Sequence, residues 1–173
     1  MARKSSPPPP GYENLRTTQT GILGERAVAS LTLLLSRHRV RLSRPYVDDH
    51  STDYLADRPP IPVAVSLQPK AATRLSKFGA FQFTFNLNQV PDDPSAFLGV
   101  CVRPGPWRGG LAPDCWVIPG VELKRGFTGK GRRTIDIHPS HRRPLRWHEF
   151  RHPIAEIGAV IGAALDDLSE RQR

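Results

Sequence analysis

Three side chains that could bind a cation and act on a phosphate stand close together in the middle of the chain. Asp53 ends a polar turn, an apolar strand-like run follows, and Gln68 and Lys70 stand two residues apart at the end of that run. Alternate side chains of a strand point to the same face, so Gln68 and Lys70 should project together, and a hairpin would bring Asp53 beside them. Oxygen ligands with an ammonium group beside them can hold a divalent cation and position a water molecule. This pattern indicates a metal-dependent phosphodiesterase. The alternative is a polar pair on the wet face of a strand and an ordinary turn aspartate.

The elements that must position these side chains follow from the spacing of apolar residues. Residues 18–35 predict an amphipathic helix, because leucine, isoleucine and alanine recur at helical intervals and Thr18 or Thr20 can cap its start. Residues 39–42 predict a first strand. A second strand should start at Asp53, and residues 61–70 predict the strand that carries the polar pair.

This arrangement resembles the PD-(D/E)XK nuclease superfamily, in particular its small bacterial branches and the related intron-encoded endonucleases. The resemblance covers residues 18–70. It rests on the helix sequence GILGERAVA at residues 21–29, on the aspartates of residues 49–53, and on the Gln-Pro-Lys of residues 68–70. It implies a restriction-endonuclease-like α/β fold, in which a mixed central sheet is flanked by an N-terminal and a C-terminal helix, and it implies DNA as the partner.

The resemblance also implies a role for each site residue. Asp53 would be the carboxylate ligand of a catalytic Mg²⁺ (or Mn²⁺), and Gln68 would contribute its amide oxygen where many relatives have a carboxylate. Lys70 would orient the attacking water and offset negative charge on the phosphate. Glu25, on the first helix, would hold water or a second ion, and Asp49 would be a reserve ligand. Since Gln68 is uncharged, the metal affinity should be weaker than in relatives with a carboxylate there.

Pro69 departs from the family pattern, which has an aliphatic or β-branched residue between the glutamine and the lysine. Proline cannot donate a hydrogen bond to a sheet and is usually found at edges or bulges, whereas this strand is expected to be central. Two alternatives follow. A bulge turns Lys70 in another direction, or the site no longer cuts and the chain is a non-catalytic nucleic-acid-binding module of the same fold.

The rest of the chain predicts an α/β domain with long connections. Strands are expected at residues 80–87, 96–102, 115–119 and 134–137, and a final helix at residues 153–168. The 18 prolines and 14 glycines indicate long irregular segments between them. We expect residues 1–16 to form a disordered proline-rich tail and residues 17–173 to form one nuclease-like domain.

Positive charge indicates a polyanionic partner. The net charge is +9, and arginine supplies most of the positive charges. An alternative explanation is a genome that favours arginine codons. Basic residues concentrate between residues 124 and 151, with Trp147 and Phe150 among them, where they could grip a phosphate backbone and stack on an unpaired base. The predicted nucleic-acid-binding residues are Lys124, Arg125, Lys130, Arg132, Arg133, Arg142, Arg143 and Arg146. The alternative is a solvated segment with the two aromatic residues in the core.

A zinc-peptidase motif competes with the nuclease interpretation. His148-Glu149-Phe150-Arg151-His152 formally matches H-E-x-x-H, in which two histidines on one helical turn bind zinc. Pro153 disfavours helical geometry at His152, and Arg151 places a charge in the middle of the motif. His138 and His141 could join these histidines in a different metal cluster, but scattered surface histidines fit the composition better.

Cysteine content and hydropathy limit the cellular context. Cys101 and Cys115 are the two cysteines, and buried free thiols are expected rather than a bridge. No apolar segment has the length of a membrane span, and the basic start lacks the apolar run of a secretory signal. We expect a cytoplasmic protein without a membrane partner. The oligomeric state stays open, with a homodimer as one option.

Overall fold

The computed structural model describes residues 17–37, 39–44, 53–72, 75–103, 105, 111–125, 131–138 and 146–173. The proposed tail, residues 1–16, lies outside this part of the chain. The helices are α1 (Thr17–Leu35), α2 (Gly120–Lys124) and α3 (Ile157–Arg171). The strands are β1 (Arg41–Ser43), β2 (Tyr54–Arg58), β3 (Ile61–Ala71), β4 (Phe81–Asn86), β5 (Phe97–Val102), β6 (Asp114–Pro119), β7 (Arg132–Ile137) and β8 (Arg151–Pro153). Short 3₁₀ turns are η1 (Leu87–Gln89), η2 (Pro94–Ala96), η3 (Arg146–Phe150) and η4 (Ile154–Glu156).

Six strands form a mixed sheet in the order β1-β2-β3-β5-β6-β8. β3 and β5 are parallel, and every other neighbouring pair in this sheet is antiparallel. The strand that carries Gln68 and Lys70 therefore lies inside the sheet, as expected. With α1 and α3 near the two ends of the chain, the predicted α/β class and its helix-flanked mixed sheet are confirmed.

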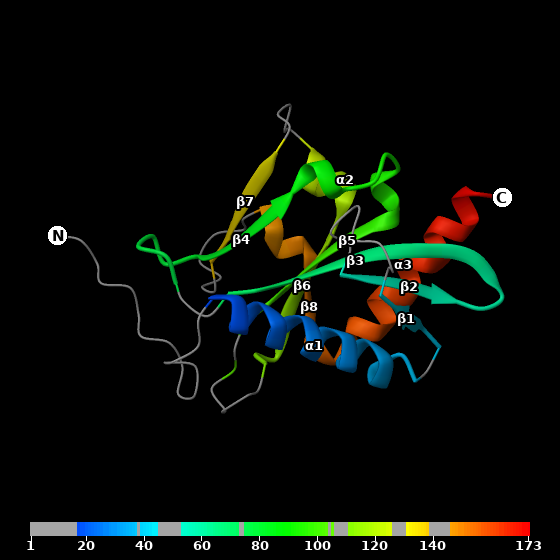
Figure 1. Cartoon of the computed structure of the whole chain (residues 1–173), viewed down its shortest axis with the longest axis horizontal. Coiled ribbons are helices and arrows are strands. Elements are labelled where there is room, and N and C mark those ends of the chain that lie inside the picture. Colours follow the sequence, from blue (N-terminus) through cyan, green and yellow to red (C-terminus); the bar gives the residue numbers. More distant parts are fainter. Residues whose placement is uncertain are drawn as a thin grey trace.

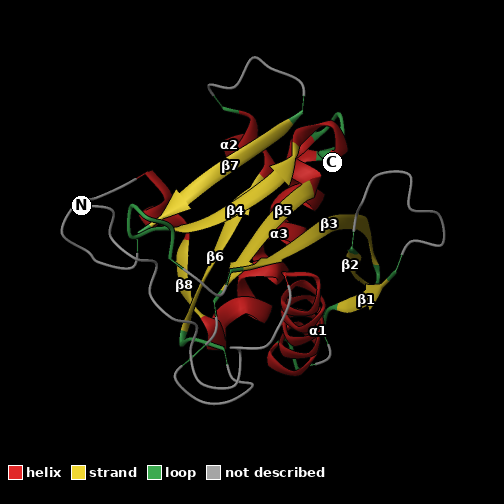
Figure 2. Ribbon diagram, turned by 60° about the vertical axis from the view of Figure 1, so that its left-hand side comes forward, coloured by secondary structure: helices red, strands yellow, loops and turns green. Residues whose placement is uncertain are grey.

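The remaining strands, β4 and β7, pair with each other to form a separate antiparallel unit, here called the ribbon (Phe81–Asn86 and Arg132–Ile137). Figures 1 and 2 show α1 on one side of the six-stranded sheet and the ribbon on the other. The sheet thus separates two apolar cores. α1 and α3 pack on Val65, Leu67 and Val100, while the ribbon packs its phenylalanines on Trp116 and Ile118.

The strict alternation of side chains in β5 and β6 explains the two cores. All residues of β5 are buried, because even-numbered residues face the helices and odd-numbered ones face the ribbon. Cys101 therefore lies on the ribbon side, and Cys115 of β6 lies on the helix side. Both thiols are buried and free, as the sequence predicted.

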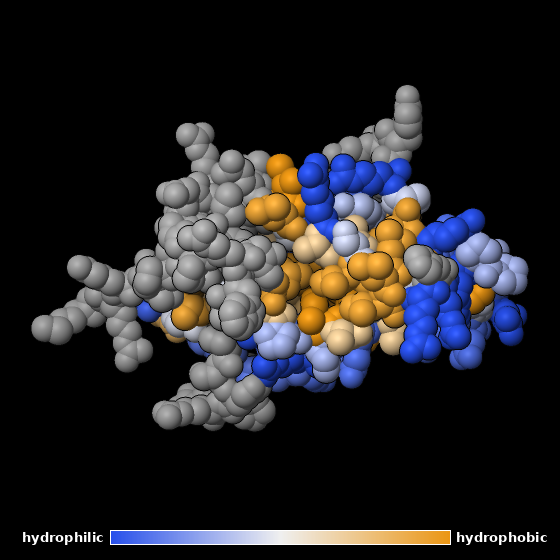
Figure 3. All heavy atoms as spheres, turned by 90° about the horizontal axis from the view of Figure 1, so that it is seen from below, coloured by the Kyte–Doolittle hydropathy of each residue, from blue (hydrophilic) through white to orange (hydrophobic). Residues whose placement is uncertain are grey.

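α1 leaves part of its apolar surface exposed. Ile22, Leu23 and Leu34 are 44%, 47% and 65% exposed. Figure 3, which looks at the molecule from the α1 side, shows apolar side chains gathered across the centre of the described surface. No helix in the described ranges is both long and apolar enough to cross a membrane.

The final helix begins later than its sequence pattern predicts. Residues 151–153 form the edge strand β8 on β6, and the 3₁₀ turn η4 follows before α3 begins at Ile157. Pro153 can occupy β8 because an edge strand leaves one side without ladder bonds. Its presence marks the end of this strand rather than the first turn of the helix.

Candidate active site

The pairing of β2 with β3 positions Asp53 relative to Gln68. Tyr54 of β2 faces Leu67 of β3 in an antiparallel register. Asp53 directly precedes Tyr54, so continuing this register by one residue puts Asp53 opposite Gln68, on the same face. This face is the ribbon side, because Tyr54 and Leu67 both point into the helix-side core. Gln68 is only 2% exposed, and Oδ2 of Asp53 and Oε1 of Gln68 are both shielded from solvent.

Lys70 shares this face because β3 is regular through Pro69. Gln68, Pro69 and Lys70 pair in unbroken succession with Gly99, Val100 and Cys101 of β5. The bulge considered from the sequence is therefore absent. Because the pairing of β3 with β5 continues through the proline, the structure removes the bulge as one of the two alternatives that Pro69 raised.

The orientation of the Pro69 nitrogen explains why β3 can pair with β5 without interruption. The backbone N–H of Ala72 donates to the carbonyl of Val102 at 3.2 Å. Since N–H groups alternate in direction along a strand, the nitrogen of Pro69 points away from β5, toward the β2 side. The register with β2 ends at Leu67, before Pro69, so no described ladder bond needs the missing N–H.

Lys70 is half-buried at the end of β3, opposite Cys101. Burial raises the pKa of the Cys101 thiol well above its ordinary value, and the ammonium of Lys70 opposes this rise. The charge of Lys70 therefore acts on a buried group, the Cys101 thiol, on the ribbon side of the sheet. Two polar side chains on this face, Gln68 and Lys70, come from one strand at the predicted spacing.

Glu25 of α1 lies on the helix side of the sheet, next to Arg44, a residue that the sequence analysis missed. Nη2 of Arg44 lies 3.9 Å from Oε2 of Glu25 and donates a hydrogen bond to the Tyr54 hydroxyl at 3.3 Å. The guanidinium also lies 5.3 Å from the centre of the Tyr54 ring. The Tyr54 hydroxyl raises the pKa of Arg44, with smaller contributions from Glu25 and Asp53. Arg44 therefore lies within electrostatic reach of two of the predicted site residues.

The donor set is poor in carboxylates. Within the described ranges, no three His, Cys, Asp or Glu side chains gather in a way that could hold a metal ion. Any cation here would need the amide oxygen of Gln68 in addition to carboxylate oxygens, a set of hard oxygen donors that suits Mg²⁺ or Mn²⁺ rather than zinc. Asp49, the reserve ligand, lies outside the described residues.

Two of the predicted DNA-binding arginines donate hydrogen bonds to backbone carbonyls within the protein. Arg133 donates to the carbonyls of Leu123 and Arg125, and Arg146 donates to the carbonyl of Glu122 at 2.8 Å. These acceptors are at the C-terminal end of α2, where carbonyls lack helical partners. Both guanidiniums also lie over Trp147, at 5.6 and 4.8 Å from its ring centre. Trp147 is only 8% exposed, which supports the core alternative for this residue.

The other predicted basic residues differ in their surroundings. Lys124 donates to the carbonyls of Val90 and Pro91 at 3.3 and 3.1 Å. Arg125 forms an ion pair with Glu122 but is 71% exposed, and Arg132 is exposed on the ribbon. The last three, Lys130, Arg142 and Arg143, lie outside the described residues.

The zinc-peptidase motif does not form the helix that its chemistry needs. His148 lies in the 3₁₀ turn η3, and His152 lies in β8, opposite Cys115. The two imidazoles therefore do not share a face of one helical turn. This geometry argues against the H-E-x-x-H alternative.

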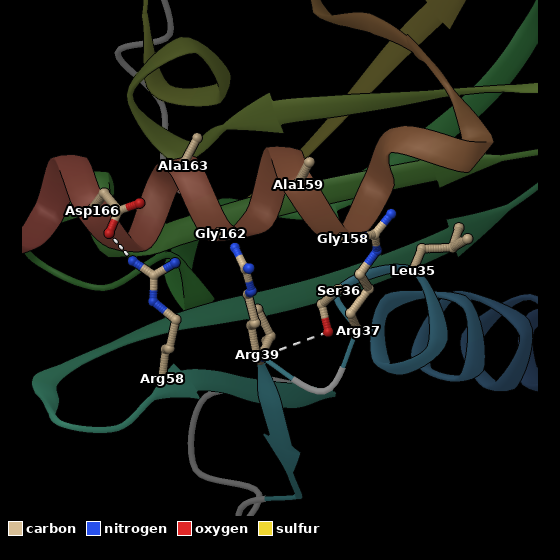
Figure 4. A pocket seen from close by; sticks show the side chains of 11 residues that line it. Leu35, Ser36, Arg37, Arg39, Arg58, Gly158, Ala159, Gly162, Ala163 and Asp166 are labelled. Carbon is tan, nitrogen blue, oxygen red and sulfur yellow. Dashed lines mark hydrogen bonds and ion pairs between the residues drawn. The ribbon is translucent and has the colours of Figure 1, made fainter.

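A second feature that the sequence analysis missed is a hollow of about 460 Å³ beside α3. It lies between α3 and the segment that joins α1 to β1, and its arginines are Arg37, Arg39 and Arg58 (Figure 4). Arg58 forms an ion pair with Asp166 of α3. The hollow is lined by the opposite end of β2 from Asp53, so it is separate from the candidate site.

Comparison with known proteins places this fold. No protein-family profile matches the chain, and no curated protein shows significant sequence similarity. The structure is similar to that of a bacterial homing endonuclease, I-Ssp6803I, with a TM-score of 0.55 and 13% sequence identity. The alignment covers 90% of this chain and 98% of that chain. At this identity the likeness establishes the fold alone: the chain has an α/β fold that is also found in a nuclease.

Proposed function

We propose that this protein is a metal-dependent DNA endonuclease of the PD-(D/E)XK type. The observation that carries the proposal is the register of three neighbouring strands. Continuing the register of β2 with β3 by one residue from Tyr54 would put Asp53 opposite Gln68, and the unbroken pairing of β3 with β5 keeps Lys70 on the same face as Gln68. This is the side-chain set that the sequence resemblance implies, and the fold is one that a homing endonuclease also has.

Asp53 and Gln68 are the proposed ligands of a Mg²⁺ or Mn²⁺ ion; Glu25, which the resemblance also implies as a ligand, lies on α1 beside Arg44, on the helix side of the sheet. The shielded oxygen atoms of Asp53 and Gln68 fit a hard cation that prefers oxygen. When bound, such an ion lowers the pKa of a coordinated water and offsets negative charge on the phosphate. Because Gln68 adds no charge, the proposed site should need a higher metal concentration than one with two carboxylates.

Lys70 and Arg44 supply the positive charges of the proposed site. The Lys70 ammonium would orient the attacking water by hydrogen bonding and stabilise the phosphate as its negative charge grows. Arg44 already lies near Glu25, so it would restrain the helix carboxylate relative to β2. We assign Arg44 a positioning role and Lys70 a catalytic one.

The alternative is a non-catalytic DNA-binding module of the same fold. The absence of a bulge at Pro69 removes one reason for it, and the substitution of an amide for a carboxylate at Gln68 is what still favours it. DNA as partner and a cytoplasmic location belong to the proposal in both cases.

Plasmid cleavage with a matched pair of variants tests the proposal. Supercoiled DNA is incubated with Mg²⁺ or Mn²⁺ and with wild type, Asp53→Ala or Asp57→Ala. Asp57 lies on β2, four residues after Asp53, and pairs with Arg41, with Nε of Arg41 2.7 Å from Oδ1 of Asp57. Nicking that is lost in Asp53→Ala and kept in Asp57→Ala supports the endonuclease. Salt-sensitive binding without cutting in either metal supports the module instead.

A further inference from the structure

The outer face of the ribbon presents a two-stranded row of hydrogen-bonding side chains. Gln82 faces Asp136, Thr84 faces Thr134, and Asn86 faces Arg132 across the strands. Nε2 of Gln82 donates to Oδ1 of Asp136 at 2.9 Å, and the hydroxyls of Thr84 and Thr134 are 2.9 Å apart. Five of these side chains are exposed, and Asn86 is half-buried.

The inner, buried face of the ribbon fixes the direction in which the outer polar side chains point. Phe81, Phe83, Phe85, Ile135 and Ile137 alternate with the polar residues and are buried against the six-stranded sheet. A two-stranded ribbon alone is marginally stable, but a packed apolar face makes it rigid. The polar row therefore points to solvent in one fixed orientation and loses little conformational freedom when it binds.

The ribbon also lies directly beside the candidate site. A Cβ on Gly99 would lie 2.6 Å from the Phe85 ring, so this ring rests on the backbone of β5. Gly99 is the β5 partner of Gln68. Phe85 thus connects the two features, since its neighbours Thr84 and Asn86 belong to the outer polar row. A ligand that spans the outer row lies on the same side of the sheet as Gln68 and Lys70.

We propose that the outer face of the ribbon reads base edges in the major groove of duplex DNA. A two-stranded ribbon fits this groove, and the residue types match its donors and acceptors. Gln82 can form two hydrogen bonds to adenine, Arg132 can do so to guanine, Asp136 accepts from cytosine, and a threonine methyl contacts thymine. Asn86 is less suited, because it is half-buried and its Oδ1 accepts from the backbone N–H of Asn88. The inference rests on the proposed function for the identity of the ligand, and it adds the element that selects the sequence.

The basic residues between 124 and 151 are less suited to reading base edges than the outer face of the ribbon is. Arg133 and Arg146 donate to the carbonyls of α2, and Lys124 donates to other carbonyls. Burial lowers the pKa of Arg133, with a further contribution from Arg146. These charges can attract phosphates at a distance, but their donors bond to backbone carbonyls, whereas the bonds of Gln82, Thr84 and Thr134 join exposed side chains on the outer face of the ribbon. Arg132 differs from Arg133 and Arg146, because its side chain is exposed on the outer face of the ribbon.

The test is selection from a pool of short duplexes with a randomised central region. Binding is carried out in Ca²⁺, and the recovered motif is compared between wild type, Gln82→Ala and Thr134→Ala. Each variant should lose preference at one or two adjacent positions of the motif, by about 5- to 100-fold in relative affinity. Gln172→Ala is the matched control, because Gln172 is exposed at the end of α3 on the opposite face; it should keep the wild-type motif.

Duplexes with 7-deazapurines separate major-groove reading from phosphate contact. These bases lack the N7 acceptor but keep Watson–Crick pairing, so wild type should bind the substituted motif more weakly, and Gln82→Ala should show a smaller loss. An unchanged motif in both ribbon variants, or no motif in wild type, overturns the ribbon inference. Cleavage of the same pool in Mg²⁺ is scored separately. A motif that depends on Gln82 without any cutting contradicts the endonuclease and leaves the reading role in place.

Discussion

Gly24 of α1 and Ala71 of β3 are in such close contact that a Cβ on Gly24 would lie 2.4 Å from the Cβ of Ala71. Real Cβ atoms essentially never approach to less than 3.0 Å, so the helix can lie this close only because residue 24 is glycine. The two residues directly adjoin Glu25 and Lys70. This contact therefore sets the distance between α1, which carries Glu25, and β3, which carries Lys70 on its other face.

Gly24→Ala should reduce metal-dependent cleavage by roughly 10- to 100-fold, because the added methyl moves α1 away from β3 and misplaces Glu25. Ala71→Gly in the same chain removes the opposing methyl and should restore most of the activity. Initial cleavage rates at saturating DNA measure both effects.

Gly21→Ala is the control for this pair, because a Cβ at Gly21 meets nothing within 4 Å. It should leave cleavage unchanged and stabilise the helix by up to about 1 kcal/mol. Equal rates for Gly24→Ala and Gly21→Ala would contradict a role for the close contact.

Pro69→Val should leave cleavage within about twofold of wild type, whereas Lys70→Ala should abolish it. The proline nitrogen points away from β5 and interrupts no described ladder bond, so restoring its N–H changes little. Side-by-side cleavage assays and thermal melts of both variants check this. A large gain in activity for Pro69→Val would instead mean that the native strand is distorted at Lys70.

DNA affinity should fall steeply with salt, because each neutralised phosphate releases counterions. Arg132 and Arg133 provide a matched pair, since they are neighbours on opposite faces of β7. Arg132→Ala should make the slope of log affinity against log salt shallower by about one, with the melting temperature unchanged. Arg133→Ala should lower the melting temperature, because carbonyls of α2 lose their donor. A flat salt response for wild type would rule out phosphate contacts.

The buried thiols make stability depend on alkaline pH. Burial raises the pKa of Cys115 to about 12, above the value of roughly 8.5 for an unfolded thiol. The contribution to stability is complete below the unfolded pKa and is lost as pH rises toward the folded one. Between pH 9 and 11, the free energy of unfolding should fall by roughly 1 kcal/mol per pH unit through this group. Urea melts of wild type and Cys115→Ala isolate this effect from other titrating groups, since the variant should lose this part of the pH dependence.

Local periodicity was enough to predict the elements that carry the candidate site. α1 and β3 start and end within one residue of their expected bounds, because helical and strand spacing of apolar residues is a local property. The common face of Gln68 and Lys70 also followed from strand geometry. The side of the sheet on which they lie did not, because it depends on the ribbon, whose strands are far apart in the sequence.

The contacts of charged residues were the least predictable part of the molecule. Arg44 could not be chosen among many arginines, because its contact with Glu25 depends on tertiary structure. Tyr54 was also missed, although it directly follows Asp53 in the sequence. The function of Arg133 was misjudged for the same reason as Arg44: α2, a five-residue helix, was not foreseen, and neither were the carbonyls at its end.

The alternation of the ribbon has a consequence for how its surface can change over generations. Every second residue of β4 belongs to the core, and the residues between them face solvent. Substitutions at positions 82, 84 and 134 can therefore accumulate without repacking the phenylalanines behind them, although positions 84 and 134 face each other and change as a pair. Surface substitutions of this kind usually change stability by less than about 0.5 kcal/mol. A chain built in this way can drift to new ligands by single steps that leave the apolar face of the ribbon unchanged.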